Sequence, residues 1–302
     1  MAEKIRNDIN GWLVIDKPYG MGSTEAVTQI KRLCHPMKIG HGGTLDPLAT
    51  GVLPIALGKA TRTVDYVMNG TKTYEFKVKF GIQTSTDDVA GAQVAVCDKI
   101  PTPEQLKATL SAFVGDIKQT PPAYSALKIG GKRACDLARS GKKVEMKSRI
   151  IHIEKLELLQ MTAPDEALFR VVCGKGTYVR SLGRDIALQA GSVGHITYLR
   201  RTHNGAFDIK DSFSLEQIEK MWYKGELQEH LFKIETVLSD ILELAVDEKQ
   251  AHLLGLGQAL CGGDFSSLQQ GDVYKALLNG ELVAFVRVDG AFVQPTKVFK
   301  QI

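Results

Sequence analysis

Apolar runs typical of β-strands recur along most of this chain. Residues 74–80 alternate strictly, with aromatic residues and valine at even positions and charged residues between them, which predicts a half-buried strand. Residues 12–15 are continuously apolar and predict a short buried strand. The apolar run at 52–57 contains Pro54, which argues against an ordinary central strand. Further strands are predicted at residues 150–159, 168–172 and 195–202.

Two helix starts carry the capping-box signal. Thr102 is followed by Pro103 and then Gln105, and Ser214 is followed three residues later by Gln217. In this arrangement the hydroxyl and the amide satisfy N–H groups that the first helical turn leaves unpaired. Helices are therefore predicted to begin just after residues 102 and 214.

Two more helices are predicted where a capping residue precedes apolar residues at helical spacing. Ser23 or Thr24 can cap the first, and Thr177 can cap the second. The second helix carries Arg180 in its first turn, where a positive charge opposes the helix dipole. We therefore expect a carboxylate or a phosphate beside Arg180.

The stretch 40–51 holds four glycines, one histidine and one carboxylate. Glycine permits backbone conformations closed to other residues, and Pro47 biases Asp46 towards an extended backbone. A carboxylate held in one direction, with His41 five residues before it, can serve as a nucleophile or a general base. The alternative is an Asp-Pro turn in a glycine-rich loop, with His41 as a packing or capping residue.

Positive charge is concentrated in one segment. The chain has a formal net charge of +4, but residues 128–149 hold eight lysines and arginines against two acidic residues. A local basic stripe is the pattern expected for phosphate binding. We expect this basic segment to be a mobile excursion without structure of its own; a solvated surface loop is the alternative. Its expected phosphate contacts are Lys132, Arg133, Lys142 and Lys143.

The composition, 44% hydrophobic and 24% charged, is typical of a folded globular protein. The five cysteines are widely spaced and form no Cys/His cluster with zinc-site spacing, so no metal is expected, and reduced thiols indicate a cytoplasmic location. The N-terminus lacks the apolar core of a signal peptide, and no run approaches the roughly 20 apolar residues of a membrane span. We expect no membrane partner.

The character of the chain changes towards its C-terminus. Residues 214–248 hold nine acidic and three basic residues, which indicates the exit from a first domain. Beyond them lie short strand-like runs and glycine-rich turns, and Asp289-Gly290 between two apolar runs predicts a hairpin. We therefore expect a small β-rich domain over residues 241–302.

Six short motifs follow one another along residues 10–235. They occupy residues 16–20, 41–51, 72–74, 124–128, 175–180 and 198–201. In this order they resemble the TruB family, the bacterial tRNA pseudouridine synthases that act on uridine 55 in the T-arm. The resemblance implies an α+β fold, with a mixed, mostly antiparallel sheet flanked by helices. It divides the chain into a catalytic domain at 1–240, with an RNA-binding insertion at about 124–149, and a PUA-like RNA-binding domain at 241–302.

The resemblance also implies roles for individual residues. Asp46 matches the essential aspartate that attacks the target nucleotide, and His41 matches the histidine that contacts the displaced uridine. The other matches to the substrate pocket are Tyr74, Tyr178, Arg180 and Leu199, with Lys17 and Lys128 as structural or RNA-contacting neighbours. The sequence departs from the family pattern at Ala90, where many bacterial members have an aspartate, and at Gly43-Thr44.

The chemistry implied by the resemblance suits these residues. Converting uridine to pseudouridine breaks the N1–C1′ bond and forms a bond to C5, without redox or hydrolysis, so no cofactor is expected. The base must leave the helical stack, which costs a few kcal/mol. One aspartate then suffices, either as nucleophile at C1′ or C6 or as the base that removes the C2′ proton. Arg180 can hold Asp46 ionised through a charge-assisted pair.

Two other classes of function remain to be compared. A non-catalytic RNA-binding protein or tRNA-folding chaperone would use the basic surface alone, but binding a polyanion does not require Asp46. A glycosidase would need a second carboxylate at a set distance, and no partner motif is visible. Relatives that use a guide RNA share the aspartate loop, but the basic segment favours the type that acts alone. We therefore expect a monomer whose partner is the T-arm stem-loop of tRNA, without a guide RNA.

Overall fold

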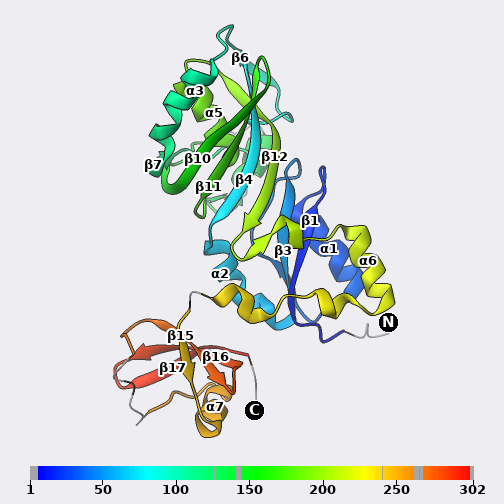
Figure 1. The fold of residues 1–302 in the computed structure, drawn as a ribbon, viewed down its shortest axis with the longest axis vertical. Coiled ribbons are helices and arrows are strands. Elements are labelled where there is room, and N and C mark those ends of the chain that lie inside the picture. The colour runs from blue at the N-terminus through cyan, green and yellow to red at the C-terminus, as the bar shows by residue number, and fades with distance from the viewer. Residues whose placement is uncertain are drawn as a thin grey trace.

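The computed structural model describes residues 6–125, 127–140, 144–239, 241–261, 265 and 268–299. Within these residues the chain forms a large mixed sheet flanked by helices and a separate, smaller sheet near the C-terminus (Figure 1). The strands of the large sheet are β1 (Gly11–Lys17), β2 (Ile39–His41), β3 (Thr50–Leu57), β4 (Lys72–Phe80), β7 (Gly115–Gln119), β10 (Arg149–Ala163), β11 (Glu166–Cys173), β12 (Gly194–Asn204) and β13 (Phe207–Asp208). Their order is β1-β3-β12-β4-β11-β10-β7, with β2 paired to β3 and β13 to β12.

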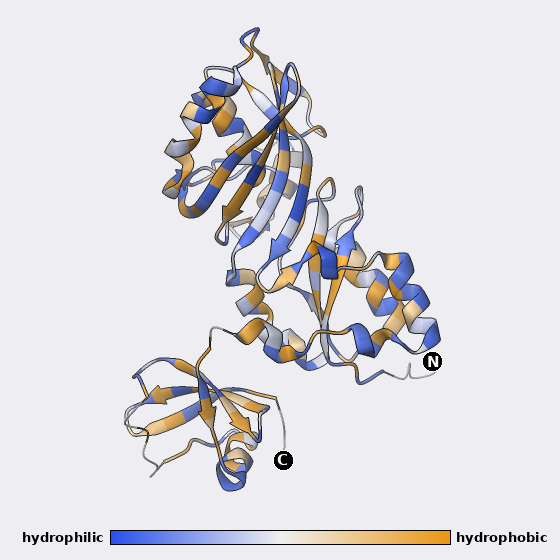
Figure 2. Cartoon of the chain, viewed as in Figure 1, coloured by the Kyte–Doolittle hydropathy of each residue, from blue (hydrophilic) through white to orange (hydrophobic). Residues whose placement is uncertain are grey.

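Pairing in the large sheet is antiparallel except between β3 and β12, which run parallel where Thr50 and Gly51 face Arg200 and Arg201. The predicted α+β class is confirmed, and the predicted strands correspond to β1, β4, β10, β11 and β12. The even-numbered side chains of β4 after Tyr74 are buried, as its alternation predicts. Figure 2 shows the same alternation of apolar and polar residues along β10 and β11.

Helices cover the large sheet in two groups. The helices of the chain are α1 (Ser23–Cys34), α2 (Val64–Asn69), α3 (Pro103–Leu110), α4 (Ala134–Arg139), α5 (Val179–Gln189), α6 (Leu215–Lys224) and α7 (Glu248–Gly255), with 3₁₀ turns η1 (Gly58–Thr63), η2 (Ser111–Phe113), η3 (Ile209–Asp211), η4 (Leu227–His230) and η5 (Ile234–Leu238). Apolar residues of α3 and α5 form one buried cluster with β4, β10 and β11, and α1 and α6 form another with β1 and β3 (Figure 1). The two clusters share the partly buried side chains of Tyr74 and Leu199. These two residues therefore lie where the two halves of the large sheet meet.

The capping boxes predicted at Thr102 and Ser214 are confirmed at the starts of α3 and α6. The caps predicted for the other two helices are wrong. Gly22 is the N-cap of α1, because the Ser23 hydroxyl bonds instead to the backbone of Leu45. The Thr177 hydroxyl donates to a carbonyl behind it, so α5 begins without a side-chain cap.

The interpretation of Pro54 is also wrong, because β3 lies between β1 and β12. Pro54 faces Val14 of β1, but the two residues do not hydrogen-bond to each other across the strands. The Val14 carbonyl accepts from the N–H of Phe213, and the Pro54 carbonyl accepts from the N–H of Gly42. A proline fits here because its missing N–H is not needed.

The basic segment has structure of its own, contrary to the prediction. Its described part contains the paired strands β8 (Lys128–Ile129) and β9 (Lys132–Arg133), followed by α4. The N–H groups of Ala134 and Cys135 donate to the carbonyls of Leu127 and Ser125, which fold the start of α4 back onto the entry of the segment.

The smaller sheet near the C-terminus confirms the expectation of a small β domain. Its strands, in spatial order, are β14 (Glu243–Ala245), β15 (Val273–Leu278), β16 (Glu281–Asp289) and β17 (Phe292–Val298). The predicted hairpin is formed by β16 and β17, with Gly290 at φ +61° in its turn. A further pair, β5 (Ile82–Thr84) and β6 (Gln93–Val96), projects beside β12. Within the described ranges, no helix has both the length and the apolar character needed to cross a membrane.

Candidate active site

The Asp46 loop, residues 42–49, joins β2 to β3 and is fixed by residues distant in sequence. The Ser23 hydroxyl donates to the Leu45 carbonyl (2.9 Å) and accepts from the Leu45 N–H (2.8 Å). The buried guanidinium of Arg201 donates to one backbone carbonyl in the loop and one in β3. Just after the loop, Gly51 has φ +101°, and a side chain there would overlap the backbone of Arg201. The glycine therefore permits the close parallel contact of β3 with β12.

The expected partner of Arg180 is the Asp46 carboxylate. Arg180 Nε donates to Asp46 Oδ2 at 2.9 Å, and the two Nη groups donate to the carbonyls of Thr86 (3.1 Å) and Tyr124 (3.0 Å). The Arg180 side chain is only 6% exposed, whereas that of Asp46 is 39% exposed. The carboxylate is thus oriented by a buried guanidinium while part of it stays open to an incoming molecule.

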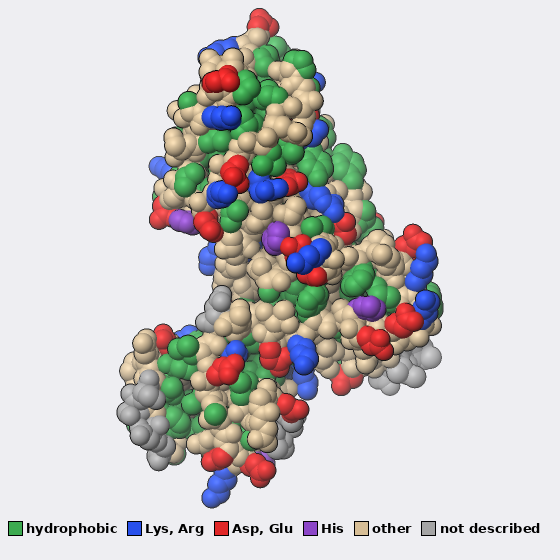
Figure 3. All heavy atoms as spheres, in the orientation of Figure 1, with side chains coloured by type: hydrophobic (Ala, Val, Ile, Leu, Met, Phe, Trp, Pro, Cys, Tyr) green, Lys and Arg blue, Asp and Glu red, His purple; other side chains and the backbone are tan. Residues whose placement is uncertain are grey.

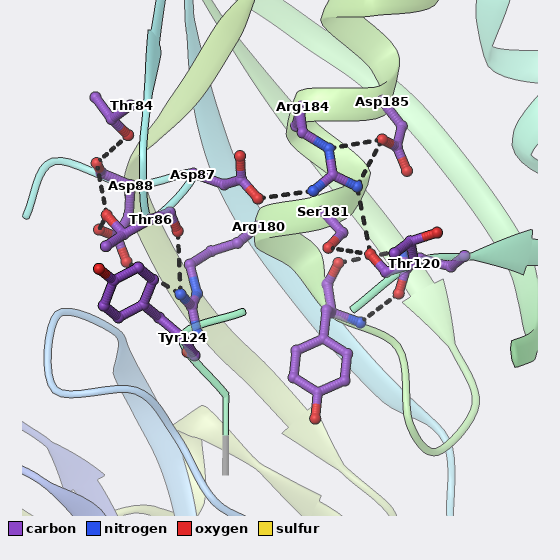
Figure 4. A network of polar contacts seen from close by, with 12 residues as sticks. Thr84, Thr86, Asp87, Asp88, Thr120, Tyr124, Arg180, Ser181, Arg184 and Asp185 are labelled. Carbon is purple, nitrogen blue, oxygen red and sulfur yellow. Dashed lines mark hydrogen bonds and ion pairs between the residues drawn. The ribbon is translucent and has the colours of Figure 1, made fainter. Parts of the chain in front are cut away.

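Two acidic residues behind Arg180 were not found by sequence reasoning (Figure 4). Asp88 lies two positions before Ala90, the site of the expected departure, and its Oδ2 is 3.6 Å from Arg180 Nη1. Asp87 Oδ2 accepts from Arg184 Nη1 at 2.9 Å, and burial raises the pKa of Asp87 although Arg184 opposes that shift. The available signal was the four-residue spacing of the two arginines, which places them on one side of α5.

A cleft of about 520 Å³ opens beside Asp46. Asp46 is the only acidic residue along its wall in the described chain, whereas the basic residues there are Lys72, Arg149, Lys175, Arg180 and Arg201. Asp46 also lines a second, smaller recess, together with Asp88, Ile196 and Leu199, among others. The carboxylate therefore borders both a basic cleft and a small, partly apolar recess.

Tyr74 and Leu199 border this cleft, as the resemblance implies. They come from the neighbouring strands β4 and β12, and the Arg201 guanidinium lies 6.0 Å from the centre of the Tyr74 ring. Burial raises the pKa of Tyr74, so its phenol is neutral at neutral pH. The two side chains supply an aromatic and an apolar surface next to Asp46.

Tyr178 also borders the cleft, directly before α5. Its backbone N–H donates to the Gln119 side-chain oxygen at 2.8 Å, and its carbonyl accepts from the Gln119 amide at 3.2 Å. The Arg149 guanidinium lies 5.1 Å from the centre of its ring. The position of Tyr178 is thus set by β7, and that of its ring by Arg149 in β10.

His41 lies at the end of β2 and is not among the residues that line the cleft in the described chain. Its Nδ1 accepts from the Gly43 N–H at 3.3 Å. Burial, assisted by the positive charge of Arg201, lowers the pKa of His41, which favours the neutral ring. In this structure His41 therefore supports the Asp46 loop.

Lys17 is buried beside the Asp46 loop, an arrangement that suits the structural one of the two roles implied by the resemblance. It is 0% exposed, and its ammonium donates to the carbonyls of Pro18 (2.9 Å), Met21 (2.6 Å) and Pro47 (3.3 Å). The last of these bonds ties β1 to the Asp46 loop. Burial lowers the pKa of Lys17 to about 8, partly opposed by the negative charge of Asp46.

The predicted phosphate contacts of the basic segment are only partly described. Lys132 is exposed on β9, and the backbones of Lys128 and Arg133 pair with each other between β8 and β9. Lys142 and Lys143 lie outside the described residues.

The described part of the chain holds no group of three or more His, Cys, Asp or Glu side chains suited to a metal ion.

Comparison with known proteins shows which families and proteins this chain is similar to. Residues 31–179 match the model of the TruB family pseudouridylate synthase N-terminal domain, and residues 180–243 match that of the tRNA pseudouridylate synthase B C-terminal domain. The chain is 44% identical to the tRNA pseudouridine synthase B of Rhodospirillum rubrum, with 96% of each chain covered. It is 45% identical to the protein of the same name from Bradyrhizobium diazoefficiens, with 97% of this chain and 87% of the relative covered.

Among solved structures, a chain from the crystal structure of a Cbf5-Nop10-Gar1 complex superimposes with a TM-score of 0.72 at 26% identity. The match covers 96% of this chain and 85% of that one. The predicted family resemblance is confirmed over nearly the whole length by the curated relatives. The chain belongs to the TruB family of pseudouridylate synthases.

Proposed function

We propose that this protein is an isomerase that converts uridine 55 in the T-arm of tRNA to pseudouridine, with Asp46 as the catalytic carboxylate. Family membership supports the reaction class, and the relatives' name, tRNA pseudouridine synthase B, supports tRNA as the substrate. The reaction breaks the N1–C1′ bond of the nucleotide and joins C5 to C1′; the proton displaced from C5 ends on a ring nitrogen, so the composition is unchanged.

The basic cleft around Asp46 is the observation that carries the proposal. A carboxylate repels a polyanion, and the positive charge of the basic residues along the same wall counters that repulsion. The face drawn in Figure 3, in contrast, shows acidic and basic side chains interspersed. Phosphates bound along the cleft would bring a flipped base towards Asp46, and Tyr74 and Leu199 would offset part of the unstacking cost.

The held but accessible carboxylate suits each of the three mechanisms. Attack at C1′, attack at C6 and removal of the C2′ proton all use the Asp46 carboxylate, which the pair with Arg180 holds in one orientation. The proposal extends to tRNA alone as partner, without a guide RNA, to a monomer in the cytoplasm, and to a PUA-like role for residues 241–302 beyond a catalytic domain ending at residue 240.

Replacement of Asp46 by Asn tests the catalytic assignment. Asp46→Asn keeps the size of the side chain but removes the charge, so single-turnover pseudouridine formation on an unmodified tRNA transcript should fall to background. Binding should persist or tighten, because the described wall of the cleft loses a negative charge. Asp165→Asn is the matched control, since this partly exposed carboxylate lies in the turn between β10 and β11, paired with Lys79.

The outcomes separate the candidate functions. Loss of turnover with retained binding and a fully active control supports the proposal. Substantial turnover by Asp46→Asn would remove Asp46 from the chemistry. A wild-type protein that binds tRNA but forms no pseudouridine would favour the RNA-binding or folding-chaperone alternative.

A further inference from the structure

Within the described part of the chain, two polar groups on the wall of the cleft are buried without a hydrogen-bond partner. They are the Ser125 hydroxyl and the Nη2 group of Arg149, and both residues line the cleft beside Tyr178. Ser125 is only 4% exposed, so water does not serve its hydroxyl freely. A buried donor without an acceptor destabilises a protein by about 1–3 kcal/mol. Two such donors on one wall indicate a missing acceptor.

The Arg149 guanidinium is held in place by the ring of Tyr178, which Gln119 positions in turn. Arg149 faces Gln119 in the pairing of β10 with β7, and the Gln119 side chain bonds both backbone groups of Tyr178. The Tyr178 ring thus provides a fixed surface against which the guanidinium lies at 5.1 Å. A guanidinium placed by stacking keeps its N–H groups available for an anion.

Ser125 is held just as firmly from the other side. The carbonyl of the preceding Tyr124 accepts from Arg180, and the Ser125 carbonyl accepts from the N–H of Cys135 at the start of α4. The backbone of Ser125 is therefore fixed by the arginine that orients Asp46. Its hydroxyl has no hydrogen-bond partner among the described residues.

We propose that Arg149 and Ser125 form a binding site for one phosphodiester group of the RNA, next to the target nucleotide. The inference rests on the proposed function, which supplies RNA as the occupant. A phosphate carries the negative charge that a guanidinium binds best and has acceptor oxygens for the hydroxyl as well. Neither the Ser125 hydroxyl nor the Arg149 Nη2 group has to give up a hydrogen bond in order to bind the phosphate. Lys175 on the same wall adds positive charge.

The site predicts two different responses to substitution. Arg149→Met removes one phosphate contact, so the slope of log affinity against log salt should fall by about 0.7–0.9. Ser125→Ala removes a neutral donor to a charged group, so affinity should fall by roughly tenfold while the salt slope stays unchanged. Lys118→Met removes one positive charge from an exposed position of β7 outside the cleft wall and is the matched control.

The decisive measurement uses T-arm stem-loops that each carry one neutral methylphosphonate linkage near the target uridine. In the wild type, one linkage should weaken binding; in Arg149→Met, the same linkage should cause no further loss, while other linkages behave as before. If Arg149→Met does not fold, Ser125→Ala replaces it, and the same linkage should then cause a smaller loss of affinity than in the wild type, because only the hydroxyl contact is already gone. Unchanged salt slope and additive losses at every linkage would overturn the site, and pseudouridine formation by the wild type would then leave the proposed function intact. Absence of that activity would remove the proposed function itself.

Discussion

Lysine ammonium groups serve as internal cross-links in this protein. The ammonium of Lys17 donates to three backbone carbonyls around the Asp46 loop, and that of Lys72 donates to the carbonyls of Val67, Met68 and Gly70 at the end of α2. Burial lowers the pKa of each to about 8. An ammonium has three donors and no acceptor, so each lysine matches a cluster of three carbonyls.

Lys17→Met should loosen the Asp46 loop, because it keeps the length of the side chain but leaves the carbonyls of Met21 and Pro18 without this donor. We expect the free energy of unfolding at neutral pH to fall by about 1–3 kcal/mol, measured by urea denaturation. Lys31→Met, at an exposed position of α1, is the control for loss of one charge. An unchanged unfolding midpoint would mean that the Lys17 bonds contribute nothing net.

The pH dependence of the same variant has a definite sign. The pKa of Lys17 is about 8 in the folded protein against 10.5 for an ordinary lysine, so the unfolded chain binds its proton more tightly. Between pH 8 and 10.5 this group makes wild-type stability rise with pH. The stability difference between wild type and Lys17→Met should therefore widen across this window; a difference that narrows would contradict the direction of the shift.

At the scale of elements, the strand alternation and the capping boxes were confirmed, whereas the predictions for Ser23 and Pro54 failed because of partners distant in the sequence. The alternation in β4 and the capping boxes of α3 and α6 depend on neighbours in sequence, so the sequence contains the information. Ser23 fails as a cap because its hydroxyl meets Leu45, and Pro54 fits a central strand because Phe213 and Gly42 take the bonds around it. Such contacts exist only after folding.

The candidate site divides in the same way. Family motifs were sufficient to predict that Asp46, Tyr74, Tyr178, Arg180 and Leu199 would lie together. Asp88 and Arg149 were missed because a lone acidic or basic residue in sequence does not reveal which cleft it faces. The burial of Lys17 was likewise invisible, since a lysine next to a Pro-Gly turn is usually exposed.

Helix α5 links two ends of the site through Arg180 and Arg184. Arg184 donates to the Asp87 carboxylate and to the Thr120 carbonyl (Figure 4). The bond to Asp87 secures the loop after β5. The carbonyl of Thr86 in the same loop accepts from Arg180. Arg184 is not among the residues that line the cleft or the smaller recess in the described chain, so we treat it as a positioning residue.

Arg184→Gln should therefore lower single-turnover pseudouridine formation while affinity for tRNA changes little. We expect roughly a tenfold loss of rate, the effect of about 1.4 kcal/mol on the barrier. Arg170→Gln is the control, because it breaks an arginine–carboxylate pair with Glu75 on the exposed side of the sheet. A parallel loss of affinity and rate, or an equal loss in the control, would argue for a general loss of stability instead.

At the scale of the whole molecule, the small C-terminal domain packs on the region around α2. The rings of Tyr66 and Phe285 lie 5.1 Å apart, and Lys297 pairs with Asp65 at 3.2 Å. Residues at the end of α2 also border the cleft, where Asn69 accepts from Lys175. One short helix therefore contacts both the small domain and the wall of the proposed RNA site.

Deletion of residues 245–302 tests how far the two units depend on each other. The candidate catalytic residues lie before residue 202, and the buried clusters of the large sheet contain no residue of the deleted part, so the remaining chain should fold and modify an isolated T-arm stem-loop. Its affinity for full tRNA should fall, because the proposed second RNA-binding surface is gone. Exposure of Tyr66 and Leu238 should lower its unfolding temperature by roughly 10 °C, since each buried apolar side chain contributes about 1.5–3 kcal/mol and 1 kcal/mol shifts the unfolding temperature of a domain of this size by about 2–4 °C.

The same deletion distinguishes a separate RNA-binding unit from a structural support of the cleft. If the small domain only adds RNA contacts, the truncated chain keeps the wild-type rate at saturating stem-loop, and only binding of full tRNA weakens. If it also holds α2 in place, the saturated rate falls as well, and a substitution confined to the contact, Phe285→Ala in the full chain, reproduces that fall. A truncated protein that is folded by circular dichroism yet inactive on the stem-loop would show that the catalytic unit does not end near residue 240. The contact through Tyr66, and not the added RNA surface, would then be the reason that the two units occur in one chain.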